Sequence, residues 1–205
     1  MALIAPRHVN AWHALSFCAC MMLSAMAVSA SEYSEVAVLD TVHSHAEFSV
    51  RLLWMVDIEG EFGNVHGNVR IDRATGQAIV DARIDANAVR MRRPGTENWV
   101  KSDEFFHVAR YPEMRFLSAP FPLSRLSEGG SLPGSLSLRG YRGDIVFTVR
   151  PATCARPAFD CDVVAAGSIR RSVFGMRSRK GTLSDKVELD LSIRVIEASN
   201  DKAAP

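Results

Sequence analysis

The side chains of Asp40, His43, Ser44 and His45 are the first candidates for chemistry in this chain of 205 residues. Asp40, His43 and Ser44 are the residue types of a hydrolytic triad, but neighbouring side chains on a strand point to opposite faces. The Gly-x-Ser-x-Gly turn that presents a nucleophile is also missing. His43 and His45 would share a strand face, yet no carboxylate cluster at recognised ligand spacing accompanies them. We therefore predict a protein that is not an enzyme and that needs no metal or other cofactor.

The composition places the chain among ordinary globular proteins with one principal domain, since 47% of the residues are hydrophobic and 23% are charged. Arg7 is the only charged residue in positions 1–30 and is one of 24 basic residues, so the remainder carries 23 basic and 23 acidic side chains. A neutral chain lacks the dense basic footprint that binding to a phosphate backbone requires. We therefore expect no nucleic-acid partner.

Residues 1–30 have the pattern of an export signal. Arg7 precedes the apolar stretch 14–28, and Val28-Ser29-Ala30 provides small residues at positions −3 and −1 of a cleavage site. The apolar stretch is shorter than the roughly 20 residues that a membrane-spanning helix needs. We predict cleavage after Ala30 and a periplasmic or secreted protein. An uncleaved anchor and a lipoprotein modified at Cys18 are the alternatives.

The cysteines outside the predicted signal are Cys154 and Cys161, which enclose six residues. A zinc site would need a further cysteine or histidine pair, and a redox site would need a Cys-x-x-Cys motif. Because export favours oxidation, we predict a structural disulfide between Cys154 and Cys161 at the end of a hairpin. Closing so short a loop stabilises the fold by about 2.5 kcal/mol in the chain-entropy model.

Alternation of apolar and polar residues, typical of strands with one buried face, dominates positions 35–198. The even positions are apolar in residues 77–89 and the odd positions are apolar in residues 186–196, which helix periodicity cannot produce. Weaker alternation predicts further strands at 36–39, 46–56, 64–72, 114–123, 132–138, 145–149 and 162–169. Gly, Pro or Asp residues mark the predicted turns, among them 57–60, 73–76, 128–130 and 139–143.

Short connections between these strands favour an antiparallel meander. We predict an all-β fold, an antiparallel closed barrel of about eight strands in residues 31–198, with one or two short helices within residues 96–108. A barrel of this size is either filled by its own side chains or holds one slender ligand, and alternation does not decide between the two. Residues 199–205 have no apolar period and are expected to form a flexible tail.

Short motifs follow one another in a fixed order between residues 36 and 198. They are Asp40-Thr41-Val42-His43-Ser44, Gly60-Glu61-Phe62, Lys101-Ser102-Asp103-Glu104-Phe105-Phe106 with Tyr111-Pro112, the segment 134–140 (GSLSLRG), the segment 170–175 (RRSVFG) and Leu183-Ser184-Asp185-Lys186-Val187. This order resembles that of the YceI-like family, whose members are exported, lipocalin-like barrels associated with polyisoprenoid lipids. Where the family often has histidine, this chain has Leu52 and Trp99, a difference that bears on the ligand's headgroup more than on the barrel.

The resemblance implies a long-chain isoprenoid lipid, polyprenyl or quinone-like, held in an apolar cavity. Such chains offer only methyl, methylene and alkene surface, so apolar burial supplies most of the affinity. The candidate lining residues are Phe48, Val50, Leu52, Trp54, Phe62, Trp99, Phe105, Phe106, Phe116, Phe147 and Phe174. The alternative for each of them is a place in the packed core, and alternation requires some of them to face outward.

Two basic clusters are candidates for binding a lipid phosphate at the mouth of the barrel, because guanidinium groups bind phosphate oxygens bidentately. The candidate binding residue is Arg90 in the first cluster, which includes Arg92 and Arg93. In the second cluster, the basic residues between positions 170 and 180, it is Arg170. Solvated loops are the alternative for both. We expect the entrance at the strand ends and the segment 96–112.

The function predicted from these observations is sequestration or transport of an isoprenoid lipid by an exported protein without chemistry of its own. We expect transient membrane contact and a homodimer. The alternative is a non-catalytic, stress-related interaction protein whose barrel is fully packed and whose exposed edge or mouth binds another protein.

Overall fold

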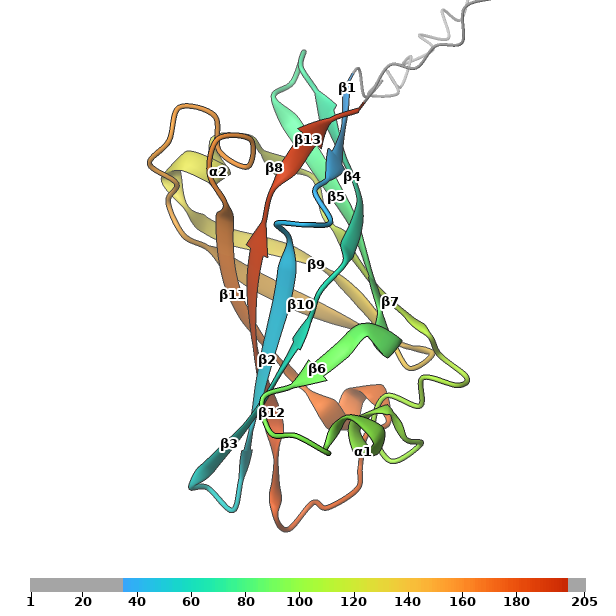
Figure 1. Ribbon diagram of the computed structural model, residues 1–205. Coiled ribbons are helices and arrows are strands. Elements are labelled where there is room, and N and C mark those ends of the chain that lie inside the picture. Colours follow the sequence, from blue (N-terminus) through green and yellow to red (C-terminus); the bar gives the residue numbers. More distant parts are fainter. Residues whose placement is uncertain (1–34, 199–205) are drawn as a thin grey trace, which may run out of the picture. The chain divides into compact units, whose positions relative to one another are not determined.

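The computed structural model describes residues 35–198, and within this range thirteen strands form a single antiparallel sheet (Figure 1). The export signal predicted for residues 1–30 and the tail predicted for residues 199–205 lie outside the described residues. Within residues 35–198 there is no helix long and apolar enough to cross a membrane. The predicted all-β class with a few short helices is confirmed.

The strands are β1 (Glu35–Leu39), β2 (His45–Leu52), β3 (Val56–Phe62), β4 (Val65–Asp72), β5 (Gln77–Asp85), β6 (Val89–Met91), β7 (Glu113–Ser118), β8 (Phe121–Pro122), β9 (Gly130–Leu138), β10 (Tyr141–Val149), β11 (Val163–Arg170), β12 (Leu183–Ile193) and β13 (Val195–Glu197). The helices are α1 (Glu97–Lys101) and α2 (Arg125–Glu128), with 3-10 turns η1 (Ala86–Ala88) and η2 (Arg171–Phe174). The order in the sheet is β13-β1-β4-β5-β7-β9-β10-β11-β12-β2-β3-β6, and β8 pairs with β5. The sheet curls around an apolar interior (Figure 1).

The number of strands among the described residues exceeds the predicted eight or nine because several long strands are interrupted. Residues 40–44 separate β1 from β2, residues 63–64 separate β3 from β4, and η1 separates β5 from β6. Arg194 alone separates β12 from β13. β1 and β2 are the two halves of one interrupted strand. β1 pairs with β4 and β13, and β2 pairs with β3 and β12, so both halves run beside the same two interrupted neighbours.

The side chain of Ser44 links the break between β1 and β2 to the break between β12 and β13. Its side chain is almost fully buried, its hydroxyl donates to the carbonyl of Arg194, and the same oxygen accepts the backbone N–H of Arg194, both at 3.1 Å. The backbone N–H of Asp40 also donates to the Arg194 carbonyl at 2.9 Å. The hydroxyl therefore supplies hydrogen bonds that the interrupted ladder cannot make.

The predicted alternation is confirmed in the two strongest segments. In β5, Ala78, Val80, Ala82 and Ile84 face the interior, and in β12 the odd positions from Val187 onward do so, with Glu188 and Asp190 outside.

The turn predicted at residues 57–60 is wrong, because these residues belong to β3 and the chain reverses at residues 53–55 instead. Gly60 lies inside β3 and lets the ring of Phe48 approach its backbone closely, since a Cβ at this position would lie 2.5 Å from Cζ of Phe48. Leu53 and Trp54 form the actual turn with φ angles of 50° and 63°, residue types that do not signal a turn in a sequence.

The predicted disulfide between Cys154 and Cys161 is present in the connection between β10 and β11. Within its loop, Ala158 is buried and its carbonyl accepts the backbone N–H of Val195 at 2.8 Å. This hydrogen bond and the disulfide hold the loop against the end of the sheet at β13.

An ion pair on the outer face joins neighbouring strands. Nε and Nη2 of Arg115 in β7 donate to the two carboxylate oxygens of Asp81 in β5, each at 2.7 Å. This bidentate hydrogen bonding lowers the pKa of Asp81 below its ordinary value.

Substituting Asp81→Asn is expected to lower the free energy of unfolding by about 1 kcal/mol at pH 7, a modest value because Arg115 is partly exposed. Since the folded-state pKa of Asp81 is depressed, the stabilisation is present above about pH 4 and is lost as the pH falls through the folded-state pKa. Urea unfolding of both proteins at pH 7 and near pH 2 measures this. An equal difference at both pH values would contradict the assignment.

Candidate functional site

A cavity of about 570 Å³ lies inside the curled sheet. Inward-facing apolar side chains line most of it, including Val80, Ala82 and Ile84 of β5 and Leu189 and Leu191 of β12. These five side chains point inward, yet they are only half-buried. They therefore border open space rather than one another, and the described interior is not filled by its own side chains.

Aromatic rings gather at the end of the cavity near α1. Phe48 of β2, Phe62 of β3 and Phe106 lie with ring centroids 5.3 to 5.8 Å apart, and Trp99 of α1 lies 4.4 Å from Phe105. Apart from the tilted Phe48–Phe62 pair these are edge-to-face pairs, which contribute beyond the apolar area that they bury. The segment after α1 therefore covers this end of the cavity with aromatic side chains.

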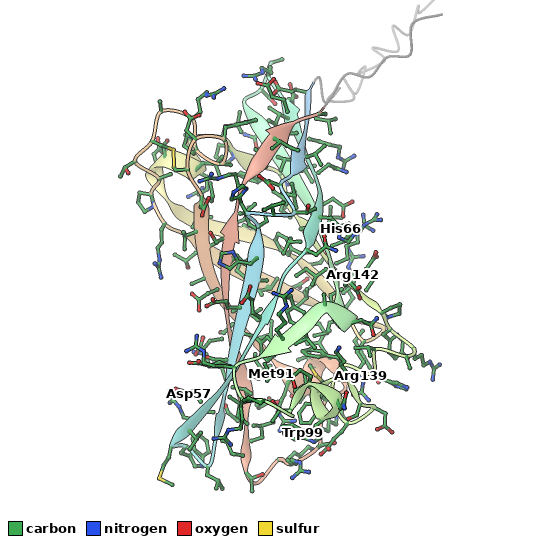
Figure 2. All side chains as sticks on the ribbon, in the orientation of Figure 1. Asp57, His66, Met91, Trp99, Arg139 and Arg142 are labelled. Carbon is green, nitrogen blue, oxygen red and sulfur yellow. A yellow bond between two sulfur atoms is a disulfide. The ribbon has the colours of Figure 1, made fainter. Side chains whose placement is uncertain are left out.

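Polar contacts fix the covering segment. The indole N–H of Trp99 donates to Glu104 at 2.7 Å and lowers the pKa of that carboxyl, with a further contribution from Arg179. Arg139 donates to the carbonyl of Asp103 at 2.6 Å and to the carbonyl of Gly175 at 2.7 Å. Figure 2 shows Trp99 and Arg139 at this same end of the sheet. The segment predicted as the entrance is thus tied down by several hydrogen bonds.

The structure brings most of the predicted lining residues together around the cavity. Those that line it are Phe48, Val50, Phe62, Trp99, Phe105, Phe106, Phe116 and Phe147. Their contact with a ligand stays a prediction. Sequence reasoning favoured aromatic residues and left out the aliphatic faces of β5 and β12, although the alternation of those segments marked them as inward-facing.

Three predicted lining residues lie outside the cavity. Trp54 is 79% exposed at the turn between β2 and β3, where no neighbouring strand covers it. Leu52 ends β2 and packs against the core without reaching the cavity. Phe174 ends η2 and is 1% exposed, because it packs against Gly143 of β10. These placements depend on strand ends that alternation does not locate.

Neither predicted phosphate-binding arginine reaches the cavity. Arg90 and Arg170 are exposed on strands β6 and β11, on the outward face of the alternation. Arg171 lines the cavity instead and is 2% exposed. The sequence offered a signal for it, since the motif Arg-x-x-Phe-Gly begins at Arg171 rather than at Arg170.

The Arg171 guanidinium is held by backbone carbonyls. Nε donates to Ser184 at 2.8 Å, Nη1 to Met176 and Ser178 at 2.7 Å each, and Nη2 to Leu183 at 3.0 Å. Burial lowers the pKa of this side chain. A single guanidinium beside the cavity therefore joins η2 to the loop that follows it and to the start of β12.

The opposite end of the cavity has a polar rim. Residues 155–159 of the disulfide loop line it, together with Glu35 and Arg73, which form an ion pair, and with Glu197. Arg156 pairs with Asp160 at 2.8 Å and lies over the ring of Phe159. Arg73, Arg156 and Glu197 of this rim are exposed, and the entrance expected at the strand ends and the segment 96–112 stays a prediction.

The residues considered for catalysis do not assemble a nucleophile. Nδ1 of His43 lies 2.7 Å from Oδ2 of Asp40, and this hydrogen bond lowers the pKa of the Asp40 carboxyl. The Ser44 hydroxyl is instead engaged with the backbone of Arg194. Within residues 35–198 no group of three or more His, Cys, Asp or Glu side chains is placed to hold a metal ion. The arrangement suits the enclosure of an apolar molecule.

Comparison with curated proteins finds relatives along most of the chain. A UPF0312 protein of Shewanella denitrificans is 26% identical over 185 residues, which cover 86% of this chain and 93% of the relative. A UPF0312 protein of Yersinia enterocolitica is 26% identical over 188 residues, which cover 87% of this chain and 93% of the relative.

Solved structures share the fold at low sequence identity. A polyisoprenoid binding domain from Saccharophagus degradans matches 80% of this chain and 99% of its own, with a TM-score of 0.58 and 16% identity. BcnA of Burkholderia cenocepacia matches 77% of this chain and 99% of its own, with a TM-score of 0.60 and 18% identity. The model of the YceI-like domain matches residues 38–195, and the chain therefore belongs to the YceI-like family.

Proposed function

We propose that this protein binds a long-chain isoprenoid lipid, polyprenyl or quinone-like, in its cavity and sequesters or carries it. The observation that carries the proposal is the half-buried state of inward-facing apolar side chains, such as Val80 and Leu191. The cavity of about 570 Å³ lies within the range of ligand pockets, about 300 to 1,000 Å³. The polyisoprenoid binding described for the Saccharophagus degradans domain supports the choice of ligand.

We also propose that the sheet closes into a barrel of eight long strands. The pairing supports this, because β12 pairs with β11 and β2, and β13, one residue after β12, pairs with β1. When each interrupted pair is counted as one strand, every strand has a neighbour on both sides. A closed barrel would leave no free edge in the sheet.

Export to the periplasm or to the outside, without chemistry of its own, is the setting proposed for this protein. The disulfide between Cys154 and Cys161 supports an oxidising compartment. The homodimer stays a prediction. The open cavity speaks against the alternative of a fully packed barrel that acts only through protein contacts.

Mass spectrometry of an organic extract, beside a native mass spectrum of protein purified without detergent, tests the proposal. We expect a stoichiometric polyprenyl or quinone species. An empty protein that also gains no thermal stability from added prenyl alcohols or quinones would overturn it and leave the interaction protein as the better account.

Filling the cavity provides a matched pair of variants. Ala82→Phe places a ring in the cavity opposite Phe116 and is expected to remove most of the bound lipid, at a cost of about 1 to 3 kcal/mol in folding stability. Ala166→Phe adds the same ring on the outward face of β11 and is expected to keep the lipid. Equal lipid content in the two purified variants would contradict binding at this site.

A further inference from the structure

The turn between β2 and β3 presents apolar side chains to solvent. Leu53, Trp54 and Met55, here called the apolar tip, are 50%, 79% and 81% exposed. The tip protrudes at the turn of the β2–β3 hairpin (Figure 1). Large apolar side chains gathered at a protruding turn mark an interaction site more often than scattered single ones do.

The backbone of the apolar tip adopts a conformation that bulky side chains disfavour. Leu53 and Trp54 have φ angles of 50° and 63°, and the N–H of Met55 donates to the carbonyl of Leu52 at 3.1 Å. The central pair of a β-turn with two positive φ angles is most often Asn-Gly, whereas bulky residues adopt the left-handed region at a cost. Strain kept at an exposed position points to use of the side chains that it displays.

A basic loop lies directly beside the tip. The N–H of Leu53 donates to the carbonyl of Thr182 at 2.7 Å, which joins the tip to residues 177–182, here called the basic loop. The loop carries Arg177, Arg179 and Lys180, all exposed, and no acidic residue. Arg179 pairs with Glu104 at 2.9 Å, while Arg177 and Lys180 form no ion pair with any described residue.

We propose that the apolar tip and the basic loop dock this protein onto an anionic phospholipid bilayer. Tryptophan is favoured at the membrane interface, and apolar neighbours such as Met55 gain by entering the acyl boundary. The unpaired cations of the basic loop match the negative charge of anionic headgroups. A second copy of the chain would bring two basic loops together, and the tip residues line neither of the two described pockets that could hold a peptide.

This docking surface goes beyond lipid binding in the cavity, since none of the tip residues lines the cavity. It lies at the end covered by α1, because Arg179 of the basic loop stacks over Trp99 at 5.1 Å. Docking would therefore bring the aromatic end of the cavity to the membrane.

Vesicle binding of the full chain tests the proposal. Subtracting the fluorescence emission of the Trp54→Phe variant from that of the native chain isolates Trp54, because the other tryptophans contribute to both spectra. We expect this difference spectrum to shift to shorter wavelength with phosphatidylglycerol vesicles, to shift less with phosphatidylcholine vesicles, and to lose the shift at high salt. An unchanged spectrum, or a shift that appears with protein concentration alone, would overturn the proposal.

A variant with a favourable turn separates docking from folding. Leu53→Asn with Trp54→Gly supplies the turn residues that this backbone prefers, so the melting temperature should hold or rise. Binding to phosphatidylglycerol vesicles should fall about tenfold or more. Retained binding would contradict the assignment.

Three further variants complete the test, and the first of them is its control. Val42→Ser with Ile196→Ser removes exposed apolar side chains elsewhere and should leave vesicle binding unchanged. Arg177→Gln and Lys180→Gln should each weaken binding about fivefold. If the Val42 and Ile196 variant lost as much binding as the turn variant, the tip would not be the docking site. The lipid content of the cavity should be the same in all of these variants, so failure of docking is distinguishable from failure of cavity binding.

Discussion

Substitution of Arg171 by methionine is expected to lower the free energy of unfolding by about 4 kcal/mol, enough to prevent folding if the native protein is only marginally stable. The guanidinium satisfies the carbonyls of Met176, Ser178, Leu183 and Ser184, and its side chain is 2% exposed. Methionine fills a similar space but leaves the buried carbonyls of Met176 and Leu183, and the partly buried ones of Ser178 and Ser184, without this donor, and each buried loss costs about 1 to 3 kcal/mol.

Urea unfolding measures the effect, and the neighbouring exposed arginine is its control. Arg170→Met should change the free energy of unfolding by no more than about 0.5 kcal/mol. Arg171→Lys keeps the charge but carries only three donors on a compact head, so it should lie between the native protein and Arg171→Met. A methionine variant with the native urea midpoint would show that the carbonyl cluster does not depend on the guanidinium.

Gly67→Ala is expected to cost about 3 kcal/mol or more, because two effects coincide at this position of β4. The backbone has a φ angle of 136°, a region that L side chains rarely adopt. A Cβ would also overlap the carbonyl oxygen of Asp81 and lie 3.1 Å from Cα of Ala82 in the paired strand β5. Backbone atoms held by a strand ladder cannot move aside as the end of a flexible side chain can.

Thermal and urea unfolding of Gly67→Ala beside Gly63→Ala checks this prediction. Gly63 lies in the break between β3 and β4, and a Cβ there meets no atom within 4 Å. Its substitution should therefore change stability little or raise it slightly. Similar losses in the two variants would indicate a general intolerance of substitution in this part of the chain rather than the close approach at Gly67.

The regular parts of the sheet were predictable from the sequence because one face of each strand is apolar. The alternation of residues 77–89 and 186–196 locates the inward faces of β5 and β12, including Ala82 and Leu191. The interruptions between β1 and β2 and between β12 and β13 were not predictable, since the Ser44 hydroxyl and the backbone N–H of Asp40 replace the ladder hydrogen bonds there. β3 was missed because Leu53 and Trp54 form its preceding turn without any turn-forming residue.

The candidate site was also predictable only inside the regular strands. Aromatic residues inside regular strands, such as Phe48 and Phe116, line the cavity as expected. Residues at strand ends do not follow the pattern, because one position decides whether a side chain faces in or out. Arg170 and Arg171 show this most clearly, since the first is exposed and the second is buried beside the cavity.

The half-buried apolar wall of the cavity has a calorimetric consequence. Inward-facing side chains such as Val80 and Leu189 line the cavity and are only half-buried, so a ligand chain would cover apolar surface that the protein alone leaves accessible. Removing apolar surface from water gives a negative change in heat capacity. The enthalpy of ligand binding should therefore become more favourable as the temperature rises, with a slope that grows with each methylene group enclosed.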